Sequence, residues 1–177
     1  MICVFLAAMS VVLYFQKEAL QAAQQIQRES LPFALTADQM VLDVVQVQQF
    51  LQDAAATHNR DSFGEADKYA QDFKKNIAKF RAMFESEQDA VALKKLAEIE
   101  QNFDAFYDLG KKMTEIYISK GIEAGNVLME DFDKRSSALG DVLNELRQEQ
   151  VDEANVMADA IVHGSTQSRN ALLLGGA

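Results

Sequence analysis

Residues 40–57 read MVLDVVQVQQFLQDAAAT, and the spacing of their apolar side chains decides the fold. These side chains recur at steps of four, three, four and three residues: Met40, Val44, Val47, Leu51 and Ala54. A helix turns once in about 3.6 residues, so this spacing keeps all of them on one face. The stretch therefore predicts an amphipathic helix that packs against other elements through that face.

The same spacing continues along the rest of the chain. An aromatic-rich series follows a turn expected at 58–61, a second series follows a turn at 85–87, and a third follows a turn at 120–126. Helices joined by turns this short run antiparallel to their neighbours. The sequence therefore predicts an all-α fold, an antiparallel up-down-up-down four-helix bundle, with helices one and four extended into membrane spans.

Three local signals refine the predicted helices. Ser62 and Glu65 have the spacing of a capping box at the start of the second helix. Pro32 lies inside the first helix and removes a backbone hydrogen bond, so we expect a kink or a restart near Leu31. Gln150 interrupts the apolar series of the fourth helix, and we expect looser packing around it.

Composition narrows the function classes. The chain has 177 residues, which suits a single domain. Its 27 acidic and 17 basic residues give a net charge of -10, and such a surface repels the phosphates of nucleic acid. One proline and eight glycines argue against collagen and against small β domains that need frequent turns. The single cysteine excludes a disulfide framework.

Both ends of the chain are uncharged. Residues 1–15 read MICVFLAAMSVVLYF and residues 171–177 read ALLLGGA. Fifteen helical residues reach about 22 Å, short of the roughly 30 Å hydrocarbon core. We interpret 1–15 as a partial first transmembrane helix, 16–170 as a sensor bundle and 171–177 as the start of a second span. A signal peptide and a bundle with apolar helix ends are the alternatives.

Catalytic and metal-binding patterns do not stand out. The bundle model puts the two histidines, His58 and His163, at opposite ends, where they cannot share a metal. No Glu-x-x-His pair and no HExxH, GxGxxG or GxxxxGK[ST] motif occurs. The sequence therefore predicts neither an enzyme nor a cofactor, and a haem held by Met157 and His163 is the remaining alternative.

Polar residues beside the apolar stripe form a candidate ligand site. On the first helix Gln46, Gln49, Asp53 and Arg60 lie at offsets of zero, three, seven and fourteen, which places them on one face. Arg60 suits a carboxylate ligand because its guanidinium binds two oxygens at once. A solvated face is the alternative interpretation. The full predicted set is Gln46, Gln49, Asp53, Thr57 and Arg60 with Asn126, Glu130 and Lys134 on the last helix.

Two stretches resemble a known family. Residues 42–53, LDVVQVQQFLQD, with AAAT at 54–57, resemble the first periplasmic helix of bacterial methyl-accepting chemotaxis proteins with a four-helix-bundle sensor. Residues 117–126 and 129–133 are similar to the turn between the third and fourth helices of the same group. Similar bundles precede histidine kinases and cyclases. A non-receptor structural bundle is a further alternative.

The resemblance implies a function and partners. It implies a homodimer anchored by two flanking spans in a bacterial inner membrane, with the sensor bundle in the periplasm. The ligand, a small molecule or a ligand-binding protein, would lie between subunits at the end far from the membrane. Displacements of helix four would reach a cytoplasmic kinase and adaptor through C-terminal modules. The amino-acid receptors of this family use several arginines, whereas this chain offers only Arg60 in that zone.

Overall fold

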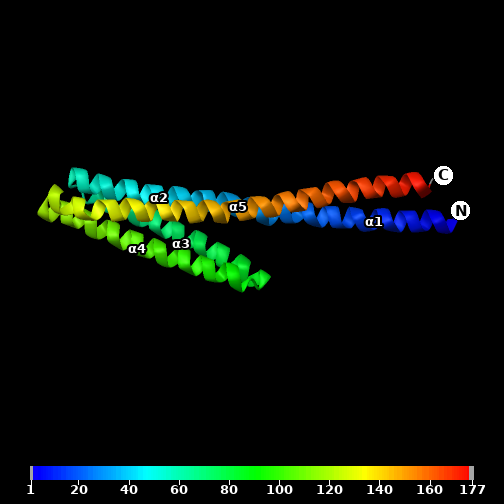
Figure 1. The fold of residues 1–177 in the computed structure, drawn as a ribbon, viewed down its shortest axis with the longest axis horizontal. Coiled ribbons are helices and arrows are strands. Elements are labelled where there is room, and N and C mark those ends of the chain that lie inside the picture. The colour runs from blue at the N-terminus through cyan, green and yellow to red at the C-terminus, as the bar shows by residue number, and fades with distance from the viewer. Residues whose placement is uncertain (1, 176–177) are drawn as a thin grey trace. The chain divides into compact units, whose positions relative to one another are not determined.

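The computed structural model describes the backbone of residues 2–175, and the side chains of 1–5, 8 and 174–177 lie outside the description. Over the described residues the chain is 96% helical and contains no strand, which confirms the predicted all-α class. The helices are α1 (Ile2–Gln25), η1 (Ile26–Ser30), α2 (Leu31–Thr57), α3 (Asp61–Glu87), α4 (Ala90–Lys120) and α5 (Ile122–Gly175) (Figure 1).

The chain divides into two compact units. Unit 1 comprises Met1–Ala34 and Gln148–Ala177, and unit 2 comprises Leu35–Arg147. The described part of unit 1 is therefore built from α1, η1, the first residues of α2 and the C-terminal part of α5. Unit 2 holds most of α2, all of α3 and α4, and the first part of α5.

The apolar stripe predicted on α2 lies in the core of unit 2. Each of its side chains is at most 1% exposed: Met40, Val44, Val47, Leu51 and Ala54. The aromatic series of α3 and α4 meet in the same core, where the rings of Phe73 and Phe103 stack at 3.8 Å between centroids. Burial of these side chains is the main favourable contribution to folding.

The turns of unit 2 fall close to their predicted positions. α2 ends at Thr57, and His58 takes a left-handed conformation with φ of 57° before α3 begins at Asp61. The turn expected at 85–87 lies instead at Gln88 and Asp89. There the Asp89 carboxylate caps α4 by accepting hydrogen bonds from two backbone amides of its first turn. The turn expected at 120–126 is shorter, because Gly121 alone separates α4 from α5.

The predicted capping box at the start of α3 is wrong. The Ser62 hydroxyl donates instead to the Asp53 carboxylate at 2.7 Å, from α3 to α2. Arg60 is the N-cap residue and its side chain makes no capping hydrogen bond, whereas the Asn59 side chain accepts a hydrogen bond from the Asp61 amide at 3.0 Å. A tertiary acceptor within reach thus takes the hydroxyl that the local spacing assigns to the helix end.

In unit 1 the chain passes Pro32 without a break. The segment before it, Ile26–Ser30, is a π-helix, and the Leu31 amide donates to the carbonyl of Ile26. A π-helical turn contains one more residue than an α-helical turn and often marks a local irregularity in a long helix. The irregularity expected near Leu31 is therefore a π-helical segment rather than a restart.

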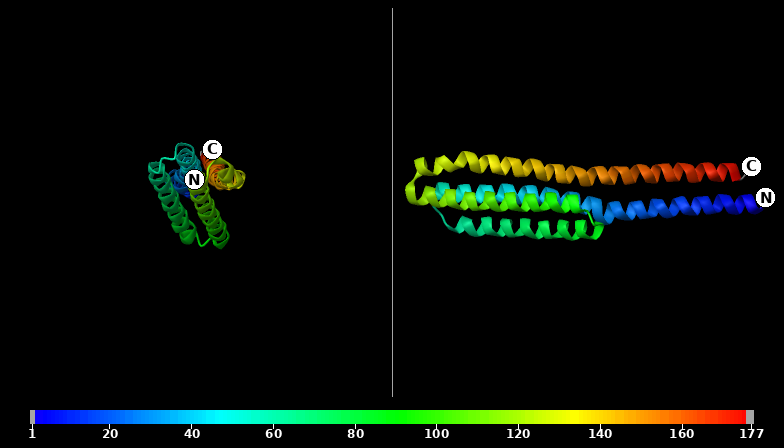
Figure 2. Two further views of the ribbon diagram at one scale, coloured as in Figure 1. Left: turned by 90° about the vertical axis from the view of Figure 1, so that its left-hand side faces the viewer. Right: turned by 60° about the horizontal axis from the view of Figure 1, so that its bottom comes forward.

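Unit 1 brings the two ends of the chain together. Figure 2 shows α1 and the C-terminal part of α5 side by side, with the N- and C-termini at the same end of this unit. Gly164 on α5 lies against Phe15 on α1, and a Cβ atom at Gly164 would be 3.8 Å from the Phe15 Cβ. Gln150 is buried here, and its side-chain carbonyl has no hydrogen-bond partner among the described residues, while the looser packing expected around it stays a prediction.

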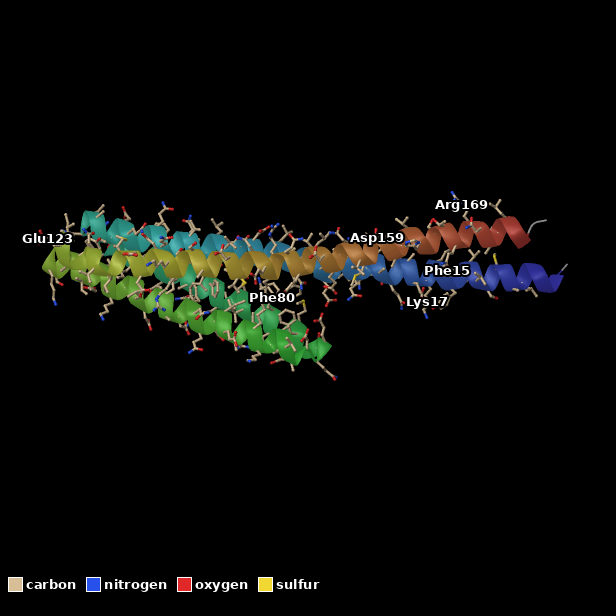
Figure 3. The ribbon with its side chains drawn as sticks, viewed as in Figure 1. Phe15, Lys17, Phe80, Glu123, Asp159 and Arg169 are labelled. Carbon is tan, nitrogen blue, oxygen red and sulfur yellow. The ribbon has the colours of Figure 1, made fainter. Side chains whose placement is uncertain are left out.

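The predicted membrane location is wrong. Within residues 2–175, none of the helices combines the length and the apolar character needed to cross a bilayer. The apolar run of α1 ends at Phe15 and is followed by Gln16 and charged Lys17, which leaves it too short for the hydrocarbon core. Figure 3 shows Asp159 and Arg169 on α5 in the same unit. The spans placed at 1–15 and 171–177, and with them a bacterial inner-membrane location with a periplasmic bundle, are not supported.

Gly110 provides a test of the packing in unit 2. A Cβ atom at this position would lie 2.4 Å from the Phe132 ring and 2.6 Å from Leu51 Cδ1. We expect Gly110→Ala to lower the free energy of unfolding by about 1–3 kcal/mol, because the overlap outweighs the better helix propensity of alanine. Gly140→Ala is the matched control on α5, since no atom lies within 4 Å of its added Cβ. It should raise the unfolding free energy by about 0.5–1 kcal/mol. Urea denaturation measures both, and equal effects would contradict the packing described here.

Candidate functional site

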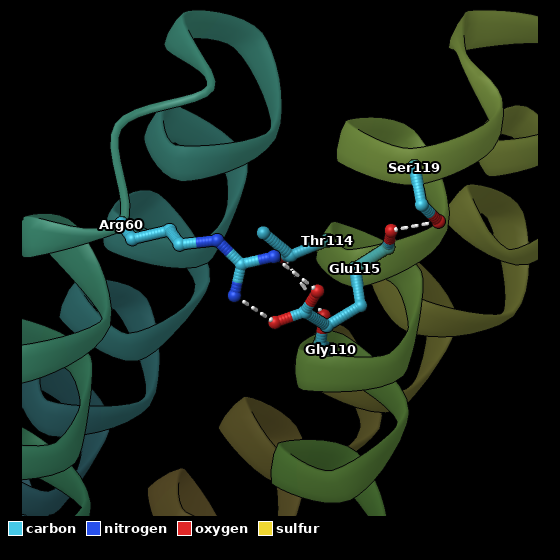
Figure 4. Close-up of polar contacts among 5 residues, drawn as sticks. All are labelled: Arg60, Gly110, Thr114, Glu115 and Ser119. Atoms are coloured by element: carbon cyan, nitrogen blue, oxygen red, sulfur yellow. Dashed lines mark hydrogen bonds and ion pairs between the residues drawn. The ribbon is translucent and has the colours of Figure 1, made fainter.

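Arg60 forms the best-defined polar contact at the turn between α2 and α3. Its two terminal nitrogens donate to the two carboxylate oxygens of Glu115 on α4, at 2.7 and 2.8 Å (Figure 4). Both side chains are about half exposed, so the pair adds at most about 1 kcal/mol to stability. A ligand carboxylate at Arg60 therefore has to compete with Glu115.

The other predicted site residues of α2 make mostly local contacts. The Gln46 amide donates to the Gln49 side chain at 3.5 Å. The Thr57 hydroxyl donates to the Asp53 backbone carbonyl at 2.8 Å and accepts from the Asn59 amide at 3.2 Å. These contacts hold the end of α2 in place.

The predicted site residues of α5 also contact neighbours near in sequence. The hydroxyl of Tyr117 donates to the Asn126 side chain across the Gly121 turn. Lys134 and Glu130 form an exposed ion pair at 2.6 Å along α5. Among the described residues, no hydrogen bond or ion pair joins the α2 members of the predicted set to its α5 members. The role of either group in binding a ligand stays a prediction.

Sequence reasoning missed the polar residues that do connect α2 with α5. The Gln48 and Gln52 amides both donate to the Asp133 carboxylate, at 2.8 and 3.1 Å. The Ser136 hydroxyl donates to the Gln48 side-chain oxygen at 2.7 Å. Gln48 and Gln52 stand four residues apart on one face of α2, and that spacing is the signal that could have identified them.

The core of unit 2 contains a buried aspartate. Asp43 is 0% exposed, although it lies beside the apolar stripe of α2. Its carboxylate accepts hydrogen bonds from the Gln39 amide at 2.9 Å and from the Asn76 amide on α3 at 3.3 Å. Lys79 donates to the Asn76 side-chain oxygen at 2.9 Å, which extends this network toward the surface. A buried carboxylate held by neutral amides is costly, so it is a feature to test.

The surroundings of Asp43 set its protonation. Burial raises the pKa of Asp43 above its ordinary value, the hydrogen bond from Gln39 opposes that rise, and the charge of Asp72 adds to it. The hydrogen bond from Asn76 and the charge of Lys79 lower the pKa by smaller amounts. An open pocket of about 240 Å³ adjoins the network and is lined by Gln39, Asp72, Lys75, Asn76 and Lys79.

Neither a metal site among the described residues nor a similar protein was found. Over the part of the chain that the structure describes, no three His, Cys, Asp or Glu side chains are grouped so that they could hold a metal ion. No protein-family model matches the chain, and no curated protein or solved structure matches it either.

The raised pKa of Asp43 predicts a pH-dependent stability. An unfolded aspartate titrates near pH 3.9, whereas folded Asp43 keeps its proton to a higher pH. As the pH rises through this window, the unfolded state releases its proton first, and the wild type loses stability relative to Asp43→Asn. Chemical denaturation of both proteins at a series of pH values measures the difference.

Asp72→Asn is the matched control with the opposite sign. The hydrogen bond from Lys75 lowers the pKa of Asp72, so the wild type should gain stability relative to this variant as the pH rises. If the difference in unfolding free energy between wild type and Asp43→Asn does not change with pH, the pKa of Asp43 is not raised by folding.

Proposed function

We propose that this chain is the ligand-sensing domain of a signalling receptor of the methyl-accepting chemotaxis kind, with a kinase and its adaptor as downstream partners. The resemblance of residues 42–57 and 117–133 supports this function. The observation that carries it is the continuity of α5, which runs from Ile122 to Gly175 without interruption. The helix that begins at the Gly121 turn in unit 2 thus continues into unit 1 without a loop, and we propose that it passes a displacement from one unit to the other.

Buried polar groups of α5 in unit 1 lower the free-energy cost that we propose for such a displacement. The Gln150 side-chain carbonyl and the Ser168 hydroxyl are buried and have no hydrogen-bond partner among the described residues. Burial and the nearby charge of Glu29 also raise the pKa of Glu153. Unpaired buried groups destabilise the arrangement that contains them, and we propose that α5 has a second arrangement in which these groups reach water. A ligand needs a differential affinity of only about 1–2 kcal/mol to shift such a balance.

The proposed arrangement of unit 2 is an antiparallel up-down-up-down bundle. Contacts between neighbouring helices support it, because the residue number rises along one helix as it falls along the other. Between α2 and α3 the supporting pairs are Asp43–Asn76 and Asp53–Ser62. Between α3 and α4 they are Lys74–Asp104 and Arg81–Glu100. Between α4 and α5 they are Phe106–Phe132 and Tyr117–Asn126.

We further propose that the receptor is a homodimer that pairs through α1 and α2. Exposed apolar residues recur at steps of three, four and seven on α1 and at steps of seven and three on α2, the pattern of a coiled-coil seam. In unit 1 they are Leu6, Met9, Leu13 and Leu20. In unit 2 they are Leu35, Leu42 and Val45, which are 68%, 46% and 48% exposed. In each unit the stripe would pair with the same stripe of a second copy, and in unit 2 Gln49 would continue the seam four residues beyond Val45.

A charge placed in the stripe tests the dimer. Leu42→Glu should raise the dimer dissociation constant at least tenfold, because a carboxylate would have to be buried at the seam. Val91→Glu is the matched control, since Val91 is 81% exposed on α4 and lies off the stripe. Sedimentation equilibrium gives the dissociation constants. A wild type that is monomeric at every concentration, or two variants with the same behaviour, would refute the seam.

The contact between Phe15 and Gly164 allows displacement of α5 to be measured. Its Cβ separation of 3.8 Å lies within the range that a disulfide spans. We therefore choose the pair Phe15→Cys and Gly164→Cys in a background with Cys3 replaced by serine. Lys74→Cys with Asp104→Cys, a pair between α3 and α4, serves as the control in unit 2.

A ligand should change the crosslinking rate of the first pair and leave the second unchanged. A thermal-shift screen of amino acids and small organic acids identifies a stabilising compound, and the oxidation rate is then measured with and without it. We expect a severalfold change for the α1–α5 pair, because a shift of about 1 kcal/mol alters a population ratio about fivefold. A bound compound that leaves this rate unaltered would count against signalling through α5.

A further inference from the structure

Unit 2 contains a second cavity, which lies between α4 and α5. It has a volume of about 160 Å³ and is lined by Ile99 and Asn102 on α4 and by Arg135, Ala138, Leu139 and Val142 on α5. The four α5 residues recur at steps of three, one and three, so they share one face of that helix. None of them belongs to the ligand site predicted from the sequence.

The walls of this cavity are apolar. Ile99 and Leu139 form its buried part and are 2% and 3% exposed. Val142 is partly buried, and Ala138 lies on the solvent side. An apolar cavity of about 150 Å³ holds a ring of the size of benzene. The cavity between α4 and α5 therefore has room for a ring of about six carbon atoms.

Two polar side chains stand at the edge of the cavity. The Arg135 Nε donates to the Asp131 carboxylate at 3.1 Å, and this contact fixes the orientation of the guanidinium. Its terminal nitrogens have no acceptor among the described residues, so they are available to a carboxylate. Asn102 supplies both a donor and an acceptor from the facing helix.

Arg135 gives an anion a partner at this position, although a ligand carboxylate shares its guanidinium with Asp131. Arg135 is the charged member of the lining set, in a chain whose net charge is -10. Such a chain repels most anions from its surface, so an anion needs a specific cationic partner to bind. A guanidinium at the edge of an apolar cavity matches a ligand with a carboxylate at one end and a ring at the other.

We propose that the cavity between α4 and α5 binds a small monocarboxylate with an apolar ring. The ring lies against Ile99, Leu139 and Val142, and the carboxylate accepts hydrogen bonds from Arg135 and Asn102. Binding at this cavity does not depend on the proposed sensing function, and the two are tested separately.

Sodium benzoate is the probe that tests this proposal. It should raise the melting temperature in a saturable manner and shift the methyl NMR signals of Ile99 and Leu139. Benzamide, which lacks the charge, and acetate, which lacks the ring, should bind at least tenfold more weakly. Absence of benzoate binding at millimolar concentration would overturn the proposal.

Substitutions in the cavity lining show whether benzoate binds between α4 and α5. Arg135→Gln should weaken benzoate binding at least tenfold, and it should leave the fold intact because this side chain is 43% exposed. Ala138→Leu should weaken binding by filling the cavity while Arg135 keeps its charge. Arg81→Gln, which removes an arginine paired with Glu100 elsewhere in unit 2, should leave benzoate affinity unchanged.

The result for Arg60 separates this cavity from the predicted ligand site. If Arg60→Gln abolishes benzoate binding and Arg135→Gln does not, the ligand lies at the turn between α2 and α3, and the present proposal is overturned. Full benzoate binding with an unchanged crosslinking rate between α1 and α5 would confirm the cavity and count against the sensing function alone.

Discussion

The close approach of two side chains, Leu51 and Phe132, to the backbone at Gly110 is the contact on which the packing of unit 2 depends. With no side chain at this position, Leu51 on α2 and Phe132 on α5 both reach the backbone of α4. One turn later the Thr114 hydroxyl donates to the Leu51 carbonyl at 2.9 Å and so ties α4 to α2. The Phe106 and Phe132 rings stack beside this point with centroids 4.8 Å apart. The approach of α2 and α5 to α4 thus follows from one small residue and the large side chains that fill the space it leaves.

The two units differ in how well their buried polar groups are hydrogen-bonded. In unit 2 most buried polar side chains are hydrogen-bonded, as in the Asp43 network and the bond from Ser136 to Gln48, and the exception, Arg147 Nε, lies 3.4 Å from the Asp38 carboxylate. In unit 1 Gln150 and Ser168 are buried without a hydrogen-bond partner among the described residues. Paired groups favour a single arrangement, whereas unpaired groups destabilise the arrangement that contains them. This contrast is the physical basis for proposing a rigid ligand-binding region and a region in which α5 is displaced.

The cavity between α4 and α5 and the network around Asp43 differ in the ligands they suit. The first has apolar walls and a single guanidinium. The second is lined by amides and by charges of both signs, several of which already bind one another. An apolar cavity with one cationic group favours an amphipathic anion, because the ring is transferred from water while the carboxylate keeps a charged partner. The structure thus separates an apolar cavity with one guanidinium at its edge from a buried carboxylate held in a polar network.

The sequence by itself determined the helices, because the spacing of apolar residues follows from the geometry of the α-helix. The stripe from Met40 to Ala54 is buried as predicted, and the turn at His58 lies where the pattern stops. The partners of the polar side chains were decided only by the tertiary structure. Ser62 binds Asp53 instead of capping its own helix, and Arg60 binds Glu115 on α4. Those pairings depend on which side chains the packing brings within about 3 Å, and local spacing carries no information about distances between helices.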